Sequence, residues 1–322
     1  MKRVSAVLWL FAAVPLLASC GEASEDSGSS EKTSETRTVE HALGTSEAPE
    51  RPQRIVSLSV GEITDTLIAL DHKPVGSVTY DPVADAYGGS GNNGAYPPAL
   101  AGRTEDIESV GIYEPNLEKI ASLKPELIIG ETWNTERIYE ELSEIAPTIA
   151  ISPERDFKVW LQEIGNAIGA ENEAEEVLTR YREWAEAVRA EVEGARVSVV
   201  RPRSEELLLY GPPSNAGKVL SDLGIEVQPV PETGEDWSGD GTRAIGSLSL
   251  EYVPELAGEH IFAISYDLEN TSFEELIQRP LWSQITAVKE GRVHPVQGVA
   301  WTNHGPLGAM LLIDEVESAL TG

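Results

Sequence analysis

Aromatic and cationic side chains follow several of the segments that the sequence predicts as β-strands. Aromatic rings give rigid contact area to a bulky ligand, and arginine guanidinium groups form paired hydrogen bonds to anionic oxygens. Ligands of α/β proteins bind beyond the carboxyl ends of parallel strands. The predicted ligand-binding residues at these positions are Ser59, Tyr80, Trp133, Arg201, Arg203, Tyr210, Tyr266 and Trp301. Arg103, Trp237 and Arg243 are further candidates.

The sequence lacks the motifs of common enzymes. Gly89 to Gly94 matches the dinucleotide-binding pattern GxGxxG, but no predicted strand precedes it and no helix can follow at Pro97-Pro98. No HExxH, Walker or GxSxG motif occurs. The histidines, at positions 41, 72, 260, 294 and 304, form no i, i+4 pair, so no metal site is predicted. The protein is therefore predicted to bind rather than to catalyse.

Composition excludes several classes of protein. The 322 residues are 41% hydrophobic and 24% charged, which is ordinary for globular domains. Acidic residues outnumber basic ones by 54 to 24, and the resulting charge of −30 repels nucleic acid. The single cysteine, Cys20, can form neither an internal disulfide nor a thiolate zinc site.

Short β-branched runs alternate with helical patterns in two parts of the chain, which predicts α/β structure with mainly parallel sheets. Residues 50–156 are predicted to form an N-terminal lobe and residues 195–322 a C-terminal lobe, both Rossmann-like. The predicted strands are Arg54 to Leu58, Val75 to Val78, Leu127 to Gly130 and Thr148 to Ile151 in the first lobe, and Val197 to Val200, Leu207 to Tyr210, Ile261 to Ile264 and Val293 to Val296 in the second.

Residues 157–194 carry no strand signal and are predicted to link the lobes. Apolar residues from Ala174 to Val192 recur with a period of 3.6, which predicts one long helix from about Glu171 to Glu193, after an interruption at Gly169. Such a helix measures ~35 Å at ~1.5 Å per residue. As the only covalent link, it allows a small rocking motion and resists wide closure.

Residues 1–19 have the pattern of a signal peptide. Lys2 and Arg3 precede an apolar run that is too short for a membrane-spanning helix, which needs about 20 residues. Leu17-Ala18-Ser19-Cys20 resembles a bacterial lipobox, which implies that Cys20 is lipidated and anchors the mature chain to the outer face of the bacterial cell membrane. Residues 20–49, rich in Ser, Thr and Glu, are predicted to be a disordered acidic tether.

The segment from Val110 to Gly130, VGIYEPNLEKIASLKPELIIG, predicts a helix capped by Asn116 and stopped by Pro125 before a buried strand. It closely resembles the signature of the iron-siderophore and cobalamin binding lipoproteins of ABC importers, whose two lobes are joined by one long helix. Arg54 to Leu58, Ile164 to Glu171 and Gly291 to Val296 also resemble that family.

The resemblance implies an extracytoplasmic, monomeric binding protein with no intrinsic cofactor. It implies a ferric-siderophore complex as ligand, captured between the lobes and delivered to an ABC permease. In that family one surface glutamate on each lobe pairs with permease arginines; the matching positions are Glu118 in Asn116-Leu117-Glu118 and Glu251 in Ser249-Leu250-Glu251.

Two alternatives stay open. Haem or a cobalamin-type corrinoid is the first, and haem requires an axial ligand such as Tyr80, Tyr266 or His304. A secreted α/β hydrolase acting on siderophores is the second, and the missing GxSxG motif argues against it. The acidic surface predicts a preference for neutral or cationic hydroxamate complexes over highly anionic ones.

Overall fold

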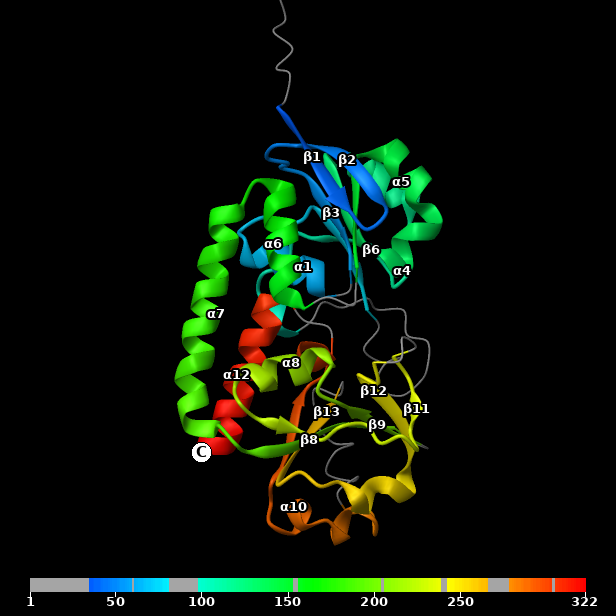
Figure 1. Ribbon diagram of the computed structural model, residues 1–322. Coiled ribbons are helices and arrows are strands. Elements are labelled where there is room, and N and C mark those ends of the chain that lie inside the picture. Colours follow the sequence, from blue (N-terminus) through cyan, green and yellow to red (C-terminus); the bar gives the residue numbers. More distant parts are fainter. Residues whose placement is uncertain are drawn as a thin grey trace, which may run out of the picture. The chain divides into compact units, whose positions relative to one another are not determined.

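The computed structural model in Figure 1 describes residues 35–59, 61–80, 98–152, 156–203, 206–238, 242–265, 278–302 and 305–322. The predicted signal peptide, Cys20, the GxGxxG segment, Tyr266 and His304 lie outside these residues. No helix in the described ranges is both long enough and apolar enough to cross a membrane.

The N-terminal lobe is built on a five-stranded sheet in which every pair of neighbours is parallel. Its strands, in sheet order, are β5 (Glu108–Ile112), β4 (Gly76–Thr79), β3 (Ile55–Leu58), β6 (Leu127–Glu131) and β7 (Thr148–Ile151). The four strands predicted for this lobe are confirmed within about one residue at each end. Strand β5 was not predicted, because Gly111 interrupts its short apolar pattern.

Helices cover both faces of this sheet. They are α1 (Glu62–Ala69), α3 (Leu117–Ser122), α4 (Thr132–Thr135) and α5 (Tyr139–Ile145), with 3-10 turns η1 (Pro98–Leu100) and η2 (Glu136–Ile138). Val56 and Leu58 pack with Ile120 and Leu142 on one face, whereas Ile55 joins the core on the other face. The predicted cap of α3 is confirmed: Asn116 Oδ1 accepts a hydrogen bond from the Lys119 N–H at 3.0 Å.

The predicted disorder of residues 20–49 is wrong for the last part of that range. Strands β1 (Thr36–His41) and β2 (Gly44–Pro49) form an antiparallel hairpin. Val39 and Ala48 are buried in the main core, and the Ala42 N–H donates to the Ala150 carbonyl of β7 at 3.0 Å. Because one valine and one alanine are the only buried side chains of the hairpin, the sequence offered no hydrophobic pattern to detect.

Two helices link the lobes, α6 (Phe157–Ile168) and α7 (Glu171–Val192). The interruption predicted at Gly169 is confirmed: this residue ends α6 at φ 72°, and a Cβ there would lie 2.4 Å from the Glu50 carbonyl oxygen. The predicted apolar stripe of α7 is buried, including Leu178, Tyr181 and Val188. Each sheet is formed by one continuous part of the sequence, so the chain passes from one sheet to the other once, through these helices.

The C-terminal lobe has a mixed sheet, which differs from the mainly parallel sheet that was expected. Its strands are β8 (Arg196–Pro202), β9 (Glu206–Tyr210), β10 (Glu226–Val227), β11 (Glu235–Asp236), β12 (Ile245–Ser249), β13 (His260–Ser265) and β14 (Val293–Gln297). Strands β10, β8, β13 and β14 are parallel, but β9 returns antiparallel beside β8, and β12 and β11 continue antiparallel. Alternating apolar runs identified these strands but not their directions.

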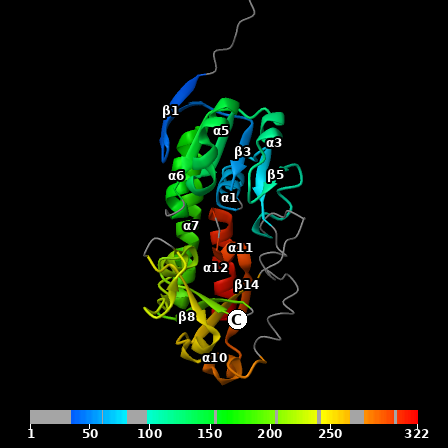
Figure 2. The same cartoon turned by 90° about the vertical axis from the view of Figure 1, so that its right-hand side faces the viewer.

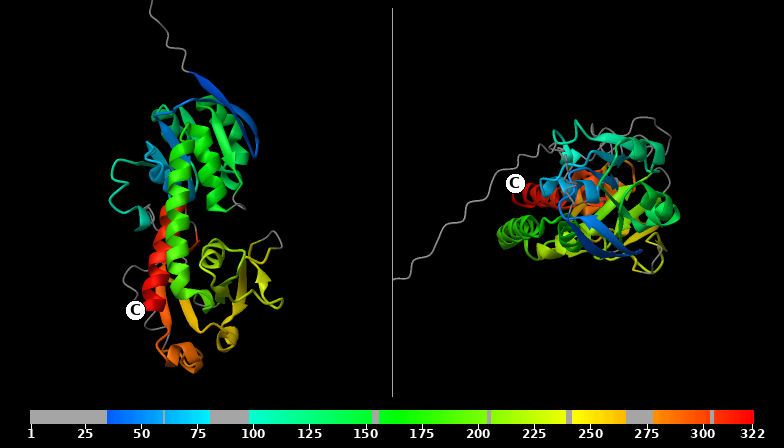
Figure 3. Two further views of the ribbon diagram at one scale, coloured as in Figure 1. Left: turned by 60° about the vertical axis from the view of Figure 1, so that its left-hand side comes forward. Right: turned by 90° about the horizontal axis from the view of Figure 1, so that it is seen from above.

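The helical segments of this lobe are α8 (Asn215–Asp222), η3 (Leu250–Glu255), η4 (Trp282–Gln284), α10 (Thr286–Lys289), α11 (Gly298–Thr302) and α12 (Pro306–Thr321). Helix α12 runs beside α7, as Figures 2 and 3 show, and it also packs against α8 and α1. One hydrophobic core therefore extends through both lobes, from Ile149 of β7 through Leu178 of α7 and Leu312 of α12 to Val296 of β14.

Candidate functional site

The carboxyl ends of β3 and β6 lie side by side in the N-terminal lobe. Leu58 is the register partner of Gly130, so Ser59 and Glu131 follow at neighbouring strand ends. Helix α1 begins directly after Ser59 and brings Glu62 to the same place. The arrangement matches the position at which parallel sheets bind ligands.

A buried pair of carboxyl groups forms the centre of this region. The Ser59 hydroxyl donates to Glu62 Oε2 at 2.8 Å, and the Trp133 indole N–H donates to Glu131 Oε2 at 2.9 Å. Glu62 and Glu131 are only 3% and 4% exposed. Carboxyl groups so deeply buried require hydrogen-bond partners, which Ser59 and Trp133 supply.

Glu131 differs in protonation from an ordinary surface glutamate. Burial and the neighbouring charge of Glu62 raise the pKa of Glu131 to about 8, although hydrogen bonds from Ser59 and Trp133 act in the opposite direction. Because its pKa lies above 7, Glu131 retains its proton at neutral pH. The protonated Glu131 can donate a hydrogen bond to Glu62.

The indole of Trp133 lies at the surface beside this carboxyl pair. The residue is 51% exposed, on the first turn of α4, and its N–H is held by Glu131. Tyr80, at the end of β4, is only 6% exposed. Trp133 is thus an exposed aromatic face fixed by a buried acceptor, which suits contact with a bulky ligand.

In the C-terminal lobe, the corresponding feature is an arginine over an indole. The Arg203 guanidinium lies 5.4 Å from the centre of the Trp237 ring, and Trp237 is 47% exposed. Arg203 also pairs with Glu206 at 3.0 Å, across the turn between β8 and β9. Arg201 lies on β8, paired in register with Leu208 and half-buried. Of these three predicted ligand residues, the structure places Arg203 against Trp237, and Arg201 lies two residues before Arg203, within β8.

Other predicted ligand residues lie elsewhere. Tyr210 is 3% exposed and pairs with Val199 in the middle of β8, because β9 is antiparallel and its carboxyl end points away from that of β8. Arg243 holds the segment before β11, donating to the Pro231 carbonyl and, at 2.6 Å, to the Gly234 carbonyl. Arg103 is exposed after η1.

Trp301 lies in the hydrophobic core and not at a ligand site. It is fully buried, its ring centre lies 4.8 Å from that of Phe262, and its indole N–H donates to Glu315 Oε2 at 2.5 Å. It was predicted as a ligand residue because it follows the last strand of the sheet, but it lies four residues after β14, within α11, which turns the ring into the core.

The two glutamates expected at the permease contact are both exposed and occupy equivalent local positions. Glu118 lies two residues after Asn116, which caps α3, and Glu251 lies two residues after Ser249, which caps η3. Each cap accepts a backbone N–H through its side chain. The two segments thus hold their carboxylates at the start of a helical turn, where negative charge is favoured.

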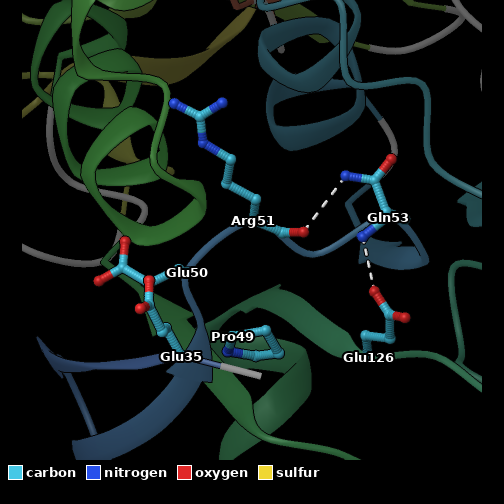
Figure 4. Close-up of a pocket in the computed structure, with 6 residues that line it drawn as sticks. All are labelled: Glu35, Pro49, Glu50, Arg51, Gln53 and Glu126. Atoms are coloured by element: carbon cyan, nitrogen blue, oxygen red, sulfur yellow. Dashed lines mark hydrogen bonds between the residues drawn. The ribbon is translucent and has the colours of Figure 1, made fainter. Parts of the chain in front are cut away.

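The structure also contains a surface pocket at the opposite end of the N-terminal sheet. Figure 4 shows the lining residues, Glu35, Pro49, Glu50, Arg51, Gln53 and Glu126, around a volume of ≈ 450 Å³. Gln53 and Glu126 precede β3 and β6, and the Gln53 N–H donates to Glu126 Oε2 at 2.6 Å. This pocket therefore lies at the amino ends of the strands, away from Ser59 and Glu131. Among the described residues, no group of three or more His, Cys, Asp and Glu is arranged to hold a metal ion.

The sequence prediction missed Glu62 and Glu131. Glu131 directly follows the predicted strand Leu127 to Gly130, and Glu62 opens the helix that follows Arg54 to Leu58. The preference of ligands for the carboxyl ends of parallel strands points to both residues. Carboxylates are mostly exposed in proteins, so the residue types alone gave no sign that this pair is buried.

Comparison with known proteins identifies the class. Residues 55–296 match the periplasmic binding protein family, and the chain belongs to this family. The probable siderophore-binding lipoprotein YfiY of Bacillus subtilis is 32% identical over 331 residues, which cover 99% of this chain and 98% of YfiY. The achromobactin-binding periplasmic protein of Dickeya dadantii is 30% identical over 283 residues, covering 82% of this chain and 85% of that protein.

The fold agrees with this assignment. The crystal structure of Staphylococcus aureus SirA complexed with staphyloferrin B has a TM-score of 0.72 and 28% identity, and the match covers 89% of this chain and 99% of SirA. The two α/β lobes joined by a long helix are therefore those of a substrate-binding protein of this family.

Proposed function

We propose that this protein captures a ferric-siderophore complex between its two lobes and delivers it to an ABC importer. The similarity to YfiY over almost the whole of both chains carries this proposal, since YfiY is named as a probable siderophore-binding lipoprotein. SirA, of the same fold, was crystallised with staphyloferrin B. Binding requires no covalent chemistry, and the siderophore itself supplies the donor oxygens to iron.

The proposed ligand contacts come from both lobes. Trp133 supplies an aromatic face beside the buried pair of Glu62 and Glu131. Arg203 and Trp237 supply a cation and a second exposed aromatic face in the C-terminal lobe. A rigid aromatic surface and a guanidinium group suit a bulky chelate with anionic oxygens. Ser59, Tyr80, Arg201 and Tyr266 complete the proposed set.

The proposed partners are the membrane and the permease. Cys20 is the proposed lipidated residue, which would anchor a monomeric chain to the outer face of the cell membrane. Glu118 and Glu251 are the proposed contacts to permease arginines, supported by their exposure and their equivalent positions after helix caps.

The decisive experiment is a titration with ferric complexes that differ in charge and chelating group. Quenching of tryptophan fluorescence and calorimetry would be followed on adding ferric staphyloferrin B, ferric achromobactin, ferric dicitrate and a neutral ferric hydroxamate. Saturable binding of at least one complex, with the complex recovered intact, is the expected result. Binding of haem or a corrinoid alone, seen in the absorbance spectrum, would replace the siderophore as ligand; hydrolysis of the siderophore would contradict a pure binding role.

The same titration tests the preference predicted from charge. The strongly acidic surface slows the approach of anionic complexes at low ionic strength. The hydroxamate complex should therefore associate faster than the citrate complex at low salt, and the difference should shrink as salt is added. Faster association of the anionic complex at low salt would contradict this preference.

A further inference from the structure

A contact between the lobes lies directly beside the buried carboxyl pair. Asp65 of α1, in the N-terminal lobe, is 3% exposed and accepts three backbone hydrogen bonds from the start of α12. The N–H groups of Gly305 and Gly308 donate to Oδ2 at 3.1 and 2.8 Å, and that of Leu307 donates to Oδ1 at 2.8 Å. One side chain thus satisfies most of the free N–H groups at this helix start.

Helix α12 belongs to the C-terminal lobe by its connections. It follows β14 and α11, and it packs against α8 of the same lobe. The Asn215 side chain of α8 donates to the Thr302 carbonyl at 2.9 Å, which fixes the end of α11. A contact that fixes the start of α12 therefore also restrains the rest of the C-terminal lobe.

The fit between α1 and α12 depends on close approach of the backbones. A Cβ on Gly305 would lie 2.8 Å from the Glu62 carbonyl oxygen and 2.9 Å from the Asp65 carboxyl group. Both distances are too short for a side chain, so only glycine permits this contact. Glu62 is thus in contact with the start of α12 through its backbone, while its carboxyl group belongs to the site with Ser59 and Glu131.

The charge distribution supports a specific contact. A carboxylate at a helix start is stabilised by the helix dipole and by N–H donors, and such charge-assisted bonds are stronger than neutral ones. Burial raises the pKa of Asp65 to about 7, the charge of Glu62 contributes to this rise, and the three N–H groups limit it by favouring the carboxylate. The charge of Glu62 therefore affects the pKa of Asp65, which lies on the same turn of α1.

We propose that Asp65 is a positioning residue for ligand binding: its contact with the start of α12 holds the two lobes in the arrangement that the ligand requires. The proposal rests on the function proposed above, because it assigns the lobes a shared ligand. The long helix α7 provides the covalent link, and the Asp65 contact provides a second, breakable link. Apolar packing of α12 against α1 and α7 also joins the lobes, so loss of the Asp65 contact would loosen their arrangement without separating them, and the ligand would then have to restore it on binding.

The test compares three variants with a matched control. Asp65→Ala removes all three acceptor contacts. Asp65→Asn keeps the size but turns an N–H₂ donor toward at least one of the helix N–H groups. Gly305→Ala keeps Asp65 and forces α1 and α12 apart. The control is Ser214→Ala, which removes the cap of α8 within one lobe and leaves the interlobe contact intact.

The first measurement needs no ligand. Spin labels at Glu144 of α5 and Lys289 of α10, both exposed, report the distance between the lobes in a chain carrying Cys20→Ser. The distance distribution should be narrow for the parent chain and Ser214→Ala, and broader for the Asp65 and Gly305 variants. Hydrogen exchange at Leu307 and Gly308 should also be faster in the Asp65 variants. An unchanged distribution in folded Asp65→Asn and Gly305→Ala would overturn the proposal.

The second measurement uses the ferric complexes of the titration above. If the competent arrangement falls to about a tenth of the molecules, the dissociation constant should rise about tenfold. Ser214→Ala should leave it unchanged. Broader distributions with unchanged affinity would overturn the positioning role. If the parent chain binds none of the complexes, the proposed function fails, whereas the distance measurement still decides whether Asp65 holds the lobes together.

Discussion

The two lobes offer a ligand different kinds of surface. In the N-terminal lobe, Trp133 is fixed by Glu131, which is itself buried and linked to Glu62 and Ser59. In the C-terminal lobe, Trp237 lies under Arg203, and the arginine is about one-third exposed and paired with Glu206. The first surface is held by buried hydrogen bonds, whereas the second is held by contacts that solvent can replace.

The difference follows from sheet topology. All strands of the N-terminal sheet end at one edge, so Ser59 and Glu131 converge on a single buried position. In the C-terminal sheet, β9 runs back beside β8, so Arg203 lies beside a turn and Tyr210 lies in the core. A parallel sheet concentrates the residues at its strand ends, and a mixed sheet disperses them. We therefore expect the N-terminal lobe to be the pre-formed half of the site and the C-terminal lobe to be the adaptable half.

The largest expected effect separates a core indole from the surface indoles. Trp301→Ala should lower the free energy of unfolding by about 3–5 kcal/mol, because it leaves a cavity beside Phe262 and removes the donor to half-buried Glu315. Urea unfolding followed by circular dichroism measures this loss. Trp237→Ala, at a 47% exposed position, is the control and should change stability little. Equal losses for the two variants would show that Trp237 also has a structural role.

A second prediction concerns the pH dependence of stability set by the carboxyl pair. The pKa of Glu131 is raised from 4.5 to about 8 in the folded protein, so the folded state binds more protons than the unfolded state between these values. The contribution of this group to the free energy of unfolding should therefore fall as pH rises from about 4.5 to about 8. Glu131→Gln should remove that slope, because an amide does not titrate. Its side chain can still accept from Trp133 and donate to Glu62.

The measurement is the free energy of unfolding at pH 5 and at pH 9. Glu131→Gln should be more stable than the parent chain at pH 9 by about 1–3 kcal/mol, since it avoids an unpaired buried charge. At pH 5 the two proteins should differ little. Glu140→Gln, at an exposed position of α5, is the control and should follow the parent chain at both pH values. A parent-like slope in Glu131→Gln would contradict the raised pKa of Glu131 as its source.

The sequence predicted those features that depend on residues close together in the chain. The strands of the N-terminal lobe, the cap at Asn116, the break at Gly169 and the stripe of α7 were all confirmed, because each depends on residues close together in the chain. The family assignment depended on a continuous motif of the same kind, and it too was confirmed.

The errors arose where long-range pairing decides the outcome. The sequence does not show that β9 pairs antiparallel with β8, so Tyr210 was predicted at the wrong edge. The hairpin of β1 and β2 is stabilised by packing on β7, about a hundred residues away in sequence, rather than by its own apolar residues. The role of Asp65 depends on a contact between residues 65 and 305–308, which only the assembled lobes create.

A third prediction compares the two exposed indoles directly. Removing either aromatic face should weaken ligand binding by ~1 kcal/mol, about fivefold in Kd. Trp133→Ala should have the larger effect, because its loss also removes the indole donor to buried Glu131. Calorimetric titration with the tightest-binding ferric complex measures both variants, and Trp133→Phe and Trp237→Phe are controls that keep an aromatic face. A larger loss from Trp237→Ala would reverse the assignment of fixed and adaptable halves.

The smallest effects are expected at the outer surface, where the two lobes should be equivalent. Glu118 and Glu251 occupy matching positions after helix caps, so each should contribute the similar, small energy of an exposed ion pair, ~0.2–1 kcal/mol, to contact with the permease. Glu118→Gln and Glu251→Gln should each slow uptake in vesicles containing the permease, and the double variant should slow it further, while ligand affinity stays unchanged. Glu114→Gln and Glu255→Gln are matched controls at exposed neighbouring positions. Because the two proposed docking glutamates lie on separate segments, their energies should add; a loss confined to one lobe would mean that the permease contacts only that lobe.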